Sequence, residues 1–180
     1  MRYINKLNLQ DMLLVAGLIL FAAIFKLVPH LPNFSPELVF VALIGARFSK
    51  SNQFLFVLLL LIVCDSLYSL ISPFSAFGSW TFMTYSGFLL IGLAANILPI
   101  NIRRWNFVGF SISAAALFWT WTNFMVWFTG VMYPHTGAGL ATCFVAGLPF
   151  LGYSLLSATV WSVGVKYALP HTFLRILQAQ

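Results

Sequence analysis

Apolar residues run along this chain in long blocks, and short polar stretches separate the blocks at fairly regular intervals. A helix needs about 20 predominantly apolar residues to cross the hydrocarbon core of a bilayer. Blocks that reach or approach this length lie at about residues 12–28, 36–48, 54–71, 80–98, 107–129 and 140–167. The second block is short, which predicts a tilted or partial span, or a helix that begins inside the preceding loop. Pro149 lies inside the sixth block, where its missing N–H predicts a kink or a break in the helix.

The start of the second block carries a helix-initiation pattern. Ser35 suits the N-cap, Pro36 the first helical position, and Glu37 the positive end of the helix dipole. We therefore interpret Glu37 as a helix-start residue rather than a catalytic acid. Further along the block, Ala42 and Ala46 form a small-xxx-small pair, a pattern that lets another helix approach closely.

Basic residues gather in stretches that six spans would place on one side of a membrane. These residues are Arg2, Lys6, Arg47, Lys50, Arg103, Arg104, Lys166 and Arg175. The opposite side has only Lys26, near the end of the first block. The positive-inside rule then places both termini in the cytoplasm. The agreement also supports the count of six spans, because omitting the second block would scatter the charges over both faces.

The composition indicates lipid as the surrounding solvent. Of 180 residues, 61% are hydrophobic and 7% are charged, whereas a soluble domain has about 25% charged residues. We therefore predict an all-α integral membrane protein with a single domain over residues 1–180. The net charge of +6 does not indicate nucleic-acid binding, because the basic residues occur in ones and twos without a patch.

Sequence features of enzymes and ATPases are absent. The chain contains no P-loop, GxSxG or HExxH motif. It has only three acidic residues, which nearly excludes catalysis by paired carboxylates. We predict no catalytic residue and no cofactor, and any ATP-driven step would come from another subunit.

The predicted topology places three connections that are rich in proline, glycine, histidine and serine on the outer side. They contain the sequences KLVPHLPNFSPEL (residues 26–38), SPFSAFGSW (72–80) and VMYPHTGAGL (131–140). A structured outer rim above an aromatic helix bundle predicts a pocket that opens to the outside.

Four residues of these connections are candidate ligand contacts. His30 and His135 each follow a proline. They could contact a ligand or a metal, or they could bind backbone carbonyls and hold their own loops. Asn33 and Tyr133 lie in the same stretches. Two histidines without a third firm ligand are a weak signal for zinc.

Asp65 is the most informative single residue, because an ionised carboxylate at the centre of a membrane helix costs about 2.5–3.5 kcal/mol on insertion scales. It predicts either a ligand anchor or proton carrier, or an interhelical hydrogen bond to Asn123 or a serine. Asn123 shares one helix face with Trp119 and Trp127. That arrangement predicts either a cradle for a flat polar ligand or an amide that bridges helices between buried indoles.

Four short sequences and the aspartate of the third block together resemble a bacterial family of integral-membrane transport proteins of unknown function. The sequences are PHLPNFSP, TNFMVW, YPHTGAGL and CFVAGLPF, and the resemblance covers about residues 26–160. The size, six helices, cytoplasmic termini and outer loops are also similar to the substrate-binding S components of energy-coupling-factor vitamin transporters.

The similarity to S components implies capture of a vitamin, nickel or cobalt from outside. It also implies docking on a transmembrane coupling subunit that carries two ATPases. Small residues on early helices make that contact in S components, which points to Ala42 and Ala46 here. Solitary cobalamin-binding members place a cysteine against the cobalt, so the resemblance implies a metal or cobalt contact at Cys64.

The leading hypothesis is therefore an S-component-like, six-helix substrate-binding or uptake protein in the inner membrane of a bacterium, for a small ring-containing nutrient such as cobalamin. Its predicted ligand contacts are His30, Asn33, Asp65, Asn123, Tyr133 and His135. One alternative is a membrane enzyme that acts on a lipid-linked substrate, which requires a nucleophile or metal beside Asp65 or the histidines. The other is a scaffold subunit of a larger membrane complex, which needs no pocket.

Overall fold

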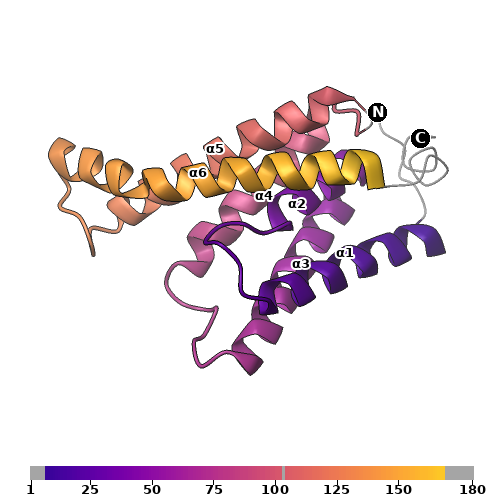
Figure 1. Ribbon diagram of the computed structural model, residues 1–180, viewed down its shortest axis with the longest axis horizontal. Coiled ribbons are helices and arrows are strands. Elements are labelled where there is room, and N and C mark those ends of the chain that lie inside the picture. Colours follow the sequence, from indigo (N-terminus) through magenta and orange to yellow (C-terminus); the bar gives the residue numbers. More distant parts are fainter. Residues whose placement is uncertain (1–6, 103, 169–180) are drawn as a thin grey trace.

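The computed structural model describes residues 7–102 and 104–168, and these residues form six helices and no strand. The helices are α1 (Leu9–Leu27), α2 (Glu37–Arg47), α3 (Lys50–Ile71), α4 (Thr81–Ile97), α5 (Trp105–Phe128) and α6 (Gly137–Ala168) (Figure 1). Each helix coincides closely with one apolar block, which confirms the all-helical prediction. Four of the basic residues from which the membrane orientation was predicted lie outside the described residues, namely Arg2, Lys6, Arg103 and Arg175.

α2 begins one position later than its initiation pattern predicts. Pro36 is the N-cap residue rather than Ser35, and no side chain forms a cap hydrogen bond there. The Ser35 carbonyl instead accepts a hydrogen bond of 2.8 Å from the Ser157 hydroxyl of α6. Glu37 lies in the first turn of α2, where the helix dipole favours an acid.

α2 is enclosed by other helices of the same chain, and α4 packs against it most extensively. Its 11 residues make it about 16 Å long, against about 30 Å for the hydrocarbon core of a bilayer. Residues in its middle have no exposed surface: Val39, Val41, Ala42, Leu43 and Ile44. α2 is therefore an interior helix that does not cross a bilayer by its own length.

Small residues let α2 and α4 approach closely. A Cβ atom added to Gly45 would lie 2.2 Å from the carbonyl oxygen of Gly92 and 2.9 Å from the Cβ of Ala95. Ala42 is fully buried, and Ala46 is partly buried against the hydrophobic core. The chain itself thus makes the close helix contact on α2, and Ala42 offers no surface to a coupling subunit in this structure.

A buried ion pair joins α1 to α2 at the end where α1 begins. Arg47 Nη2 donates to Asp11 Oδ1 at 2.7 Å, and the two side chains are 3% and 5% exposed. Asp11 also forms a capping box with Asn8, whose side-chain oxygen accepts from the Asp11 N–H at 2.8 Å. The arginine charge is therefore neutralised inside the bundle, and removing either partner would leave a buried charge.

α5 and α6 form a long hairpin that extends beyond the other helices at the left of Figure 1. The indole N–H of Trp119 on α5 donates to the carbonyl of Gly147 on α6 at 2.8 Å. α6 continues through Pro149 without interruption, so the break predicted there does not occur. Tight contacts with α5 on the preceding turn hold this part of α6 in place.

Within the described residues, three helices are long and apolar enough to cross a membrane: α1, α3 and α6. α4 is a shorter apolar helix. Large apolar side chains are exposed on these helices, for example Leu13, Leu70 and Val160. A lipid environment would cover this surface, so the fold supports the prediction of a membrane protein.

The connections between the helices lie at two ends of the molecule. In Figure 1, the connections over residues 28–36, 72–80 and 129–136 lie toward the left. The start of α1, the end of α6 and the connection between α4 and α5 lie toward the right. We call the left-hand end, which carries the three connections, the loop end.

Candidate functional site

Four polar side chains meet at the loop end, each from a different helix. Lys26, in the last turn of α1, forms ion pairs with Glu37 of α2, at 3.2 Å between Nζ and Oε1, and with Oδ1 of Asp65 on α3. The hydroxyl of Tyr85 on α4 donates to Asp65 Oδ2 at 2.8 Å. We call these four residues the Lys26 cluster.

The helix ends explain why these residues meet. The connection over residues 28–36 brings the last turn of α1 next to the first turn of α2, so Lys26 and Glu37 face each other. Each charge also has the sign that its helix end favours. α3 packs against both α1 and α4, which places Asp65 between Lys26 and Tyr85.

The Lys26 cluster is largely buried. The side chains of Lys26, Glu37 and Asp65 are 24%, 11% and 12% exposed. Two carboxylates face one ammonium group, so the ionised cluster has a formal charge of −1. Ionisable groups within membrane helices are costly, and they usually face a cavity or an ion or substrate pathway. The cluster therefore marks the loop end as the candidate functional site.

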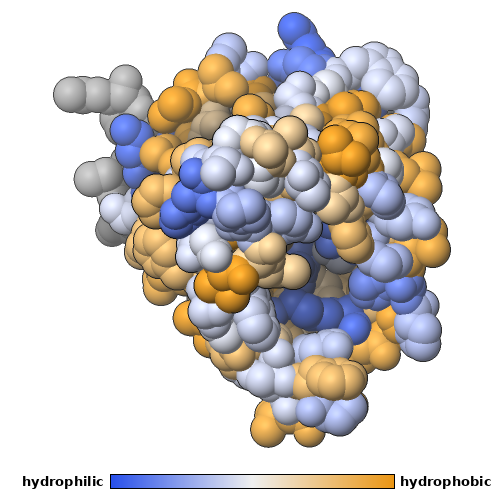
Figure 2. Space-filling model, turned by 90° about the vertical axis from the view of Figure 1, so that its left-hand side faces the viewer, coloured by the Kyte–Doolittle hydropathy of each residue, from blue (hydrophilic) through white to orange (hydrophobic). Residues whose placement is uncertain are grey.

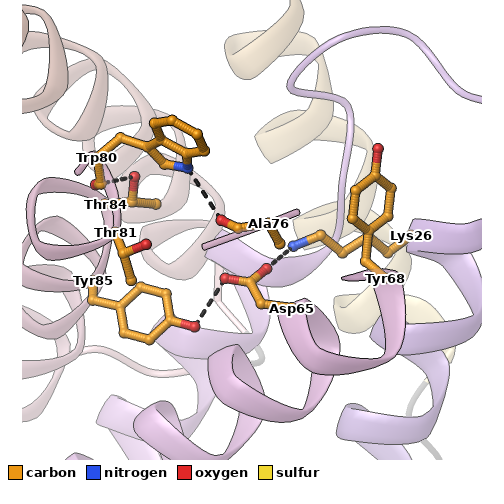
Figure 3. A pocket seen from close by; sticks show the side chains of 8 residues that line it. All are labelled: Lys26, Asp65, Tyr68, Ala76, Trp80, Thr81, Thr84 and Tyr85. Atoms are coloured by element: carbon orange, nitrogen blue, oxygen red, sulfur yellow. Dashed lines mark hydrogen bonds and ion pairs between the residues drawn. The ribbon is translucent and has the colours of Figure 1, made fainter. Parts of the chain in front are cut away.

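An open cavity of about 240 Å³ lies beside the Lys26 cluster. Its walls come from α1, α3, α4 and the connection between α3 and α4: Lys26, Asp65, Tyr68, Ala76, Trp80, Thr81, Thr84 and Tyr85 (Figure 3). In Figure 3, Lys26 and Tyr85 point toward Asp65 from opposite sides. Figure 2 shows a hollow with hydrophilic residues on the face that carries the loop end. The buried cluster and the cavity thus share a wall.

Hydrogen bonds within the connection between α3 and α4 shape one side of the cavity. The Ser69 hydroxyl accepts from the Ala76 N–H at 2.8 Å. The Trp80 indole N–H donates to the Ala76 carbonyl at 3.1 Å, and the Thr84 hydroxyl donates to the Trp80 carbonyl at 3.1 Å. These bonds fix the indole of Trp80 as a wall of the cavity.

The two loop histidines form separate contacts within the part of the chain that the structure describes. His30 Nδ1 lies 2.8 Å from the carbonyl oxygen of Leu31. His135 Nε2 lies 2.8 Å from the carbonyl oxygen of Phe128. Figure 1 shows the connection that carries His135 at the far left, away from the one that carries His30. Each histidine thus contacts a backbone carbonyl close to it in the sequence, and its role as a ligand contact stays a prediction.

Asn33 has a conformational role in its loop. Its φ angle is +58°, and the Phe34 N–H donates to the Leu31 carbonyl at 3.0 Å across it. Pro32 at the second position and an asparagine with positive φ at the third are typical of a type II turn. Asn33 thus turns the chain between α1 and α2, and it does not line the cavity.

Asn123 lies on α5, where its side chain contacts α6, and it does not line the cavity. Its Nδ2 donates to the Trp119 carbonyl at 2.8 Å, and the Cys143 thiol donates to the Asn123 carbonyl at 3.3 Å. A Cβ atom added to Gly147 would lie 2.5 Å from Asn123 Oδ1. α5 and α6 are therefore in close contact on the side of Asn123 that faces Gly147, and a ligand contact at Asn123 stays a prediction. Tyr133 is half-buried in the connection between α5 and α6.

Cys64 is buried against α1. It is 1% exposed, and its Sγ lies 4.0 Å from the carbonyl oxygen of Ile19. The residue precedes Asp65 in the sequence but does not line the cavity. Within residues 7–102 and 104–168, no three His, Cys, Asp or Glu residues gather where they could hold a metal ion. A metal or cobalt contact at Cys64 stays a prediction.

Of the ligand contacts predicted from the sequence, all of which the structure describes, Asp65 alone lines the cavity. Its partners are Lys26 and Tyr85, rather than Asn123 or a serine. Sequence reasoning missed both partners and the ion pair of Glu37. One signal could have found the two ion pairs, though not Tyr85: Lys26 is the one basic residue on the predicted outer side. Two of the chain's three acidic residues lie on that side as well.

The model of a family of unknown function, DUF6580, matches residues 6–170 of the chain. The matched region includes the whole Lys26 cluster and every residue that lines the cavity. No curated protein and no solved structure matches the chain. The match spans most of the 180 residues, and the chain therefore belongs to the DUF6580 family of unknown function.

Proposed function

We propose that this chain is a membrane protein that captures a small molecule in the cavity beside the Lys26 cluster, as the substrate-binding part of an uptake system. One observation carries the proposal: Lys26 and Asp65 belong both to a buried ion pair and to the wall of an open cavity. A contact that only joins helices would not need to border a cavity. Charged groups within membrane helices are typical of substrate and ion pathways.

We propose that both termini lie in the cytoplasm, which would open the cavity to the outside. Among the described residues, Lys50, Arg104 and Lys166 lie at the end of the bundle opposite the loop end. Lys166 Nζ lies 4.2 Å from the ring of Trp105, which holds the end of α6 beside the start of α5. By the positive-inside rule this end faces the cytoplasm, so the loop end faces the outer side of a bacterial inner membrane.

The size of the cavity limits the ligand. Its volume of about 240 Å³ lies below the range of about 300–1,000 Å³ that is typical of pockets for drug-sized ligands. A corrinoid such as cobalamin is larger than a drug-sized ligand, so the cavity would not enclose it. We therefore propose a small nutrient with one ring, or a single ring of a larger molecule, as the occupant.

Capture and transfer would be separate steps. The ligand would enter from the loop end and bind beside Asp65 and Tyr85, under the indole of Trp80. The sequence contains no nucleotide-binding motif, so energy for release to the cytoplasm would come from elsewhere. We propose a transmembrane coupling subunit with ATPases as the partner that provides it.

Two matched tryptophan variants test the proposal. Thr84 lines the cavity, whereas Thr120 is exposed on α5 away from it. Each hydroxyl donates to the carbonyl four residues earlier, at 3.1 Å and 2.9 Å. Thr84→Trp should therefore fill the cavity, and Thr120→Trp should make the same local change without filling it.

The measurement uses purified protein in detergent micelles. The protein is incubated with a small-molecule extract of its own cells, washed, and the retained compounds are identified by mass spectrometry. We expect one compound to be enriched by the wild type and by Thr120→Trp, but not by Thr84→Trp. Equal retention by Thr84→Trp, or no enrichment by the wild type, would contradict binding in this cavity.

A further inference from the structure

We propose that the cavity beside the Lys26 cluster takes a small organic cation, namely a primary ammonium compound with one ring. The inference rests on the proposed function, because it names the chemical class of the captured molecule. Three features of the cavity wall carry it: its unbalanced charge, its aromatic rings and the direction of its hydroxyl hydrogen bonds.

The first feature is a formal negative charge that no other described residue on the cavity wall balances. Lys26 neutralises one of the two carboxylates of Glu37 and Asp65, so the ionised cluster keeps a formal charge of −1. Among the described residues, no charged side chain other than Lys26 and Asp65 lines the cavity. A cationic ligand would restore neutrality where a low dielectric makes an unbalanced charge costly.

The presence of Lys26 does not make the cavity a site for anions. Its ammonium group already contacts both carboxylates, so an anion placed beside it would meet the excess negative charge. Lys26 and Tyr85 contact Asp65 through different carboxylate oxygens and from opposite sides (Figure 3). A cation can therefore approach Asp65 from the Tyr85 side, away from Lys26.

The second feature is the set of aromatic side chains around the cavity, Tyr68, Trp80 and Tyr85. The face of an aromatic ring attracts a cation that lies within about 6 Å of the ring centre. The N–H of Trp80 is occupied by the Ala76 carbonyl at 3.1 Å, so the indole presents its ring rather than a hydrogen-bond donor. Such a wall favours an organic cation over an anion.

The third feature is that two of the four hydroxyls on the cavity wall, those of Tyr85 and Thr84, already donate their protons. Tyr85 donates to Asp65, and Thr84 donates to the carbonyl of Trp80. Each hydroxyl oxygen keeps lone pairs that accept hydrogen bonds, but it has no second proton to donate. The N–H groups of a primary ammonium are donors and match these two acceptors, whereas neither of these two hydroxyls can donate to a carboxylate.

The test uses three probes that share a phenyl ring and differ in charge: 2-phenylethylammonium, 2-phenylethanol and 3-phenylpropanoate. Each is titrated by isothermal calorimetry into the full chain in detergent micelles, as wild type, Asp65→Asn and Thr84→Trp. We expect the wild type to bind the ammonium at least about tenfold more tightly than the other two probes. Asp65→Asn should abolish this preference, and Thr84→Trp should abolish binding of all three.

The outcomes separate this inference from the proposed function. If the wild type binds the alcohol or the carboxylate as tightly as the ammonium, and Thr84→Trp blocks that binding, the inference is wrong but the cavity remains the binding site. If the wild type binds none of the probes, the inference is also wrong, and the cell-extract experiment decides the proposed function. The selectivity of the wild type decides the inference even where Asp65→Asn fails to fold.

Discussion

Replacing Lys26 by methionine should destabilise the protein strongly, because it removes the cation from between two buried carboxylates. Nζ lies 3.2 Å from Glu37 and is paired with Asp65, and these acids are only 11% and 12% exposed. Removing one partner of a buried ion pair costs about 3–5 kcal/mol. Because the Lys26 side chain is 24% exposed, we expect the lower part of that range, about 3 kcal/mol.

The assay is unfolding by titration with sodium dodecyl sulfate in mixed micelles, followed by tryptophan fluorescence. Lys50→Met is the matched control, because Lys50 is exposed at the start of α3, and such a surface change costs less than about 0.5 kcal/mol. The triple variant Lys26→Met, Glu37→Gln, Asp65→Asn removes all three charges and should recover most of the loss. If Lys26→Met costs no more than Lys50→Met, the Lys26 cluster does not contribute to stability as the contacts indicate.

Three further changes test the fold. Gly45→Ala should lower the free energy of unfolding by about 1–3 kcal/mol, because its Cβ would lie 2.2 Å from the backbone of α4. The control is Gly17→Ala, whose Cβ would meet nothing within 4 Å. This control should be neutral or stabilising in the same detergent titration. Asp11→Asn removes the carboxylate beside buried Arg47 and should lower the free energy of unfolding by about 3 kcal/mol. A thermal unfolding midpoint equal to that of the wild type would contradict this prediction. Asn33→Val should lower the free energy of unfolding by about 1 kcal/mol, because residue 33 has a positive φ. Asn33→Gly should be as stable as the wild type. Equal stability of all three proteins would exclude a conformational role for Asn33.

The apolar blocks predicted the helices well, because length and hydropathy are local properties of the sequence. The initiation pattern misplaced the N-cap by one residue, because the Ser35 carbonyl is held by Ser157 of α6, a contact across 122 positions of sequence. Pro149 was expected to kink or break α6, and the break does not occur because the helix continues through it. Tertiary packing therefore decided the points at which local propensity failed.

The candidate site was predicted less completely, because its partners lie far apart in the sequence. Asp65 was recognised from the cost of a charge in a membrane helix, but Lys26 lies 39 positions away and Tyr85 lies 20. Lys26 at a helix end resembles any lysine that reaches toward the membrane interface. His30 and Asn123 have the residue types of ligand contacts, yet their hydrogen bonds go to backbone carbonyls. Only the packing of the helices distinguishes these roles.

Native mass spectrometry of the wild-type protein, extracted gently from its own membrane, tests the central claim most directly. The account predicts one small molecule bound per chain, which dissociates from the chain on collisional activation. The mass of that molecule would identify the substrate class. A chain that carries no small molecule, whether alone or held by another membrane protein, would contradict the claim. In that case the Lys26 cluster and the cavity beside it would be part of the helix packing alone.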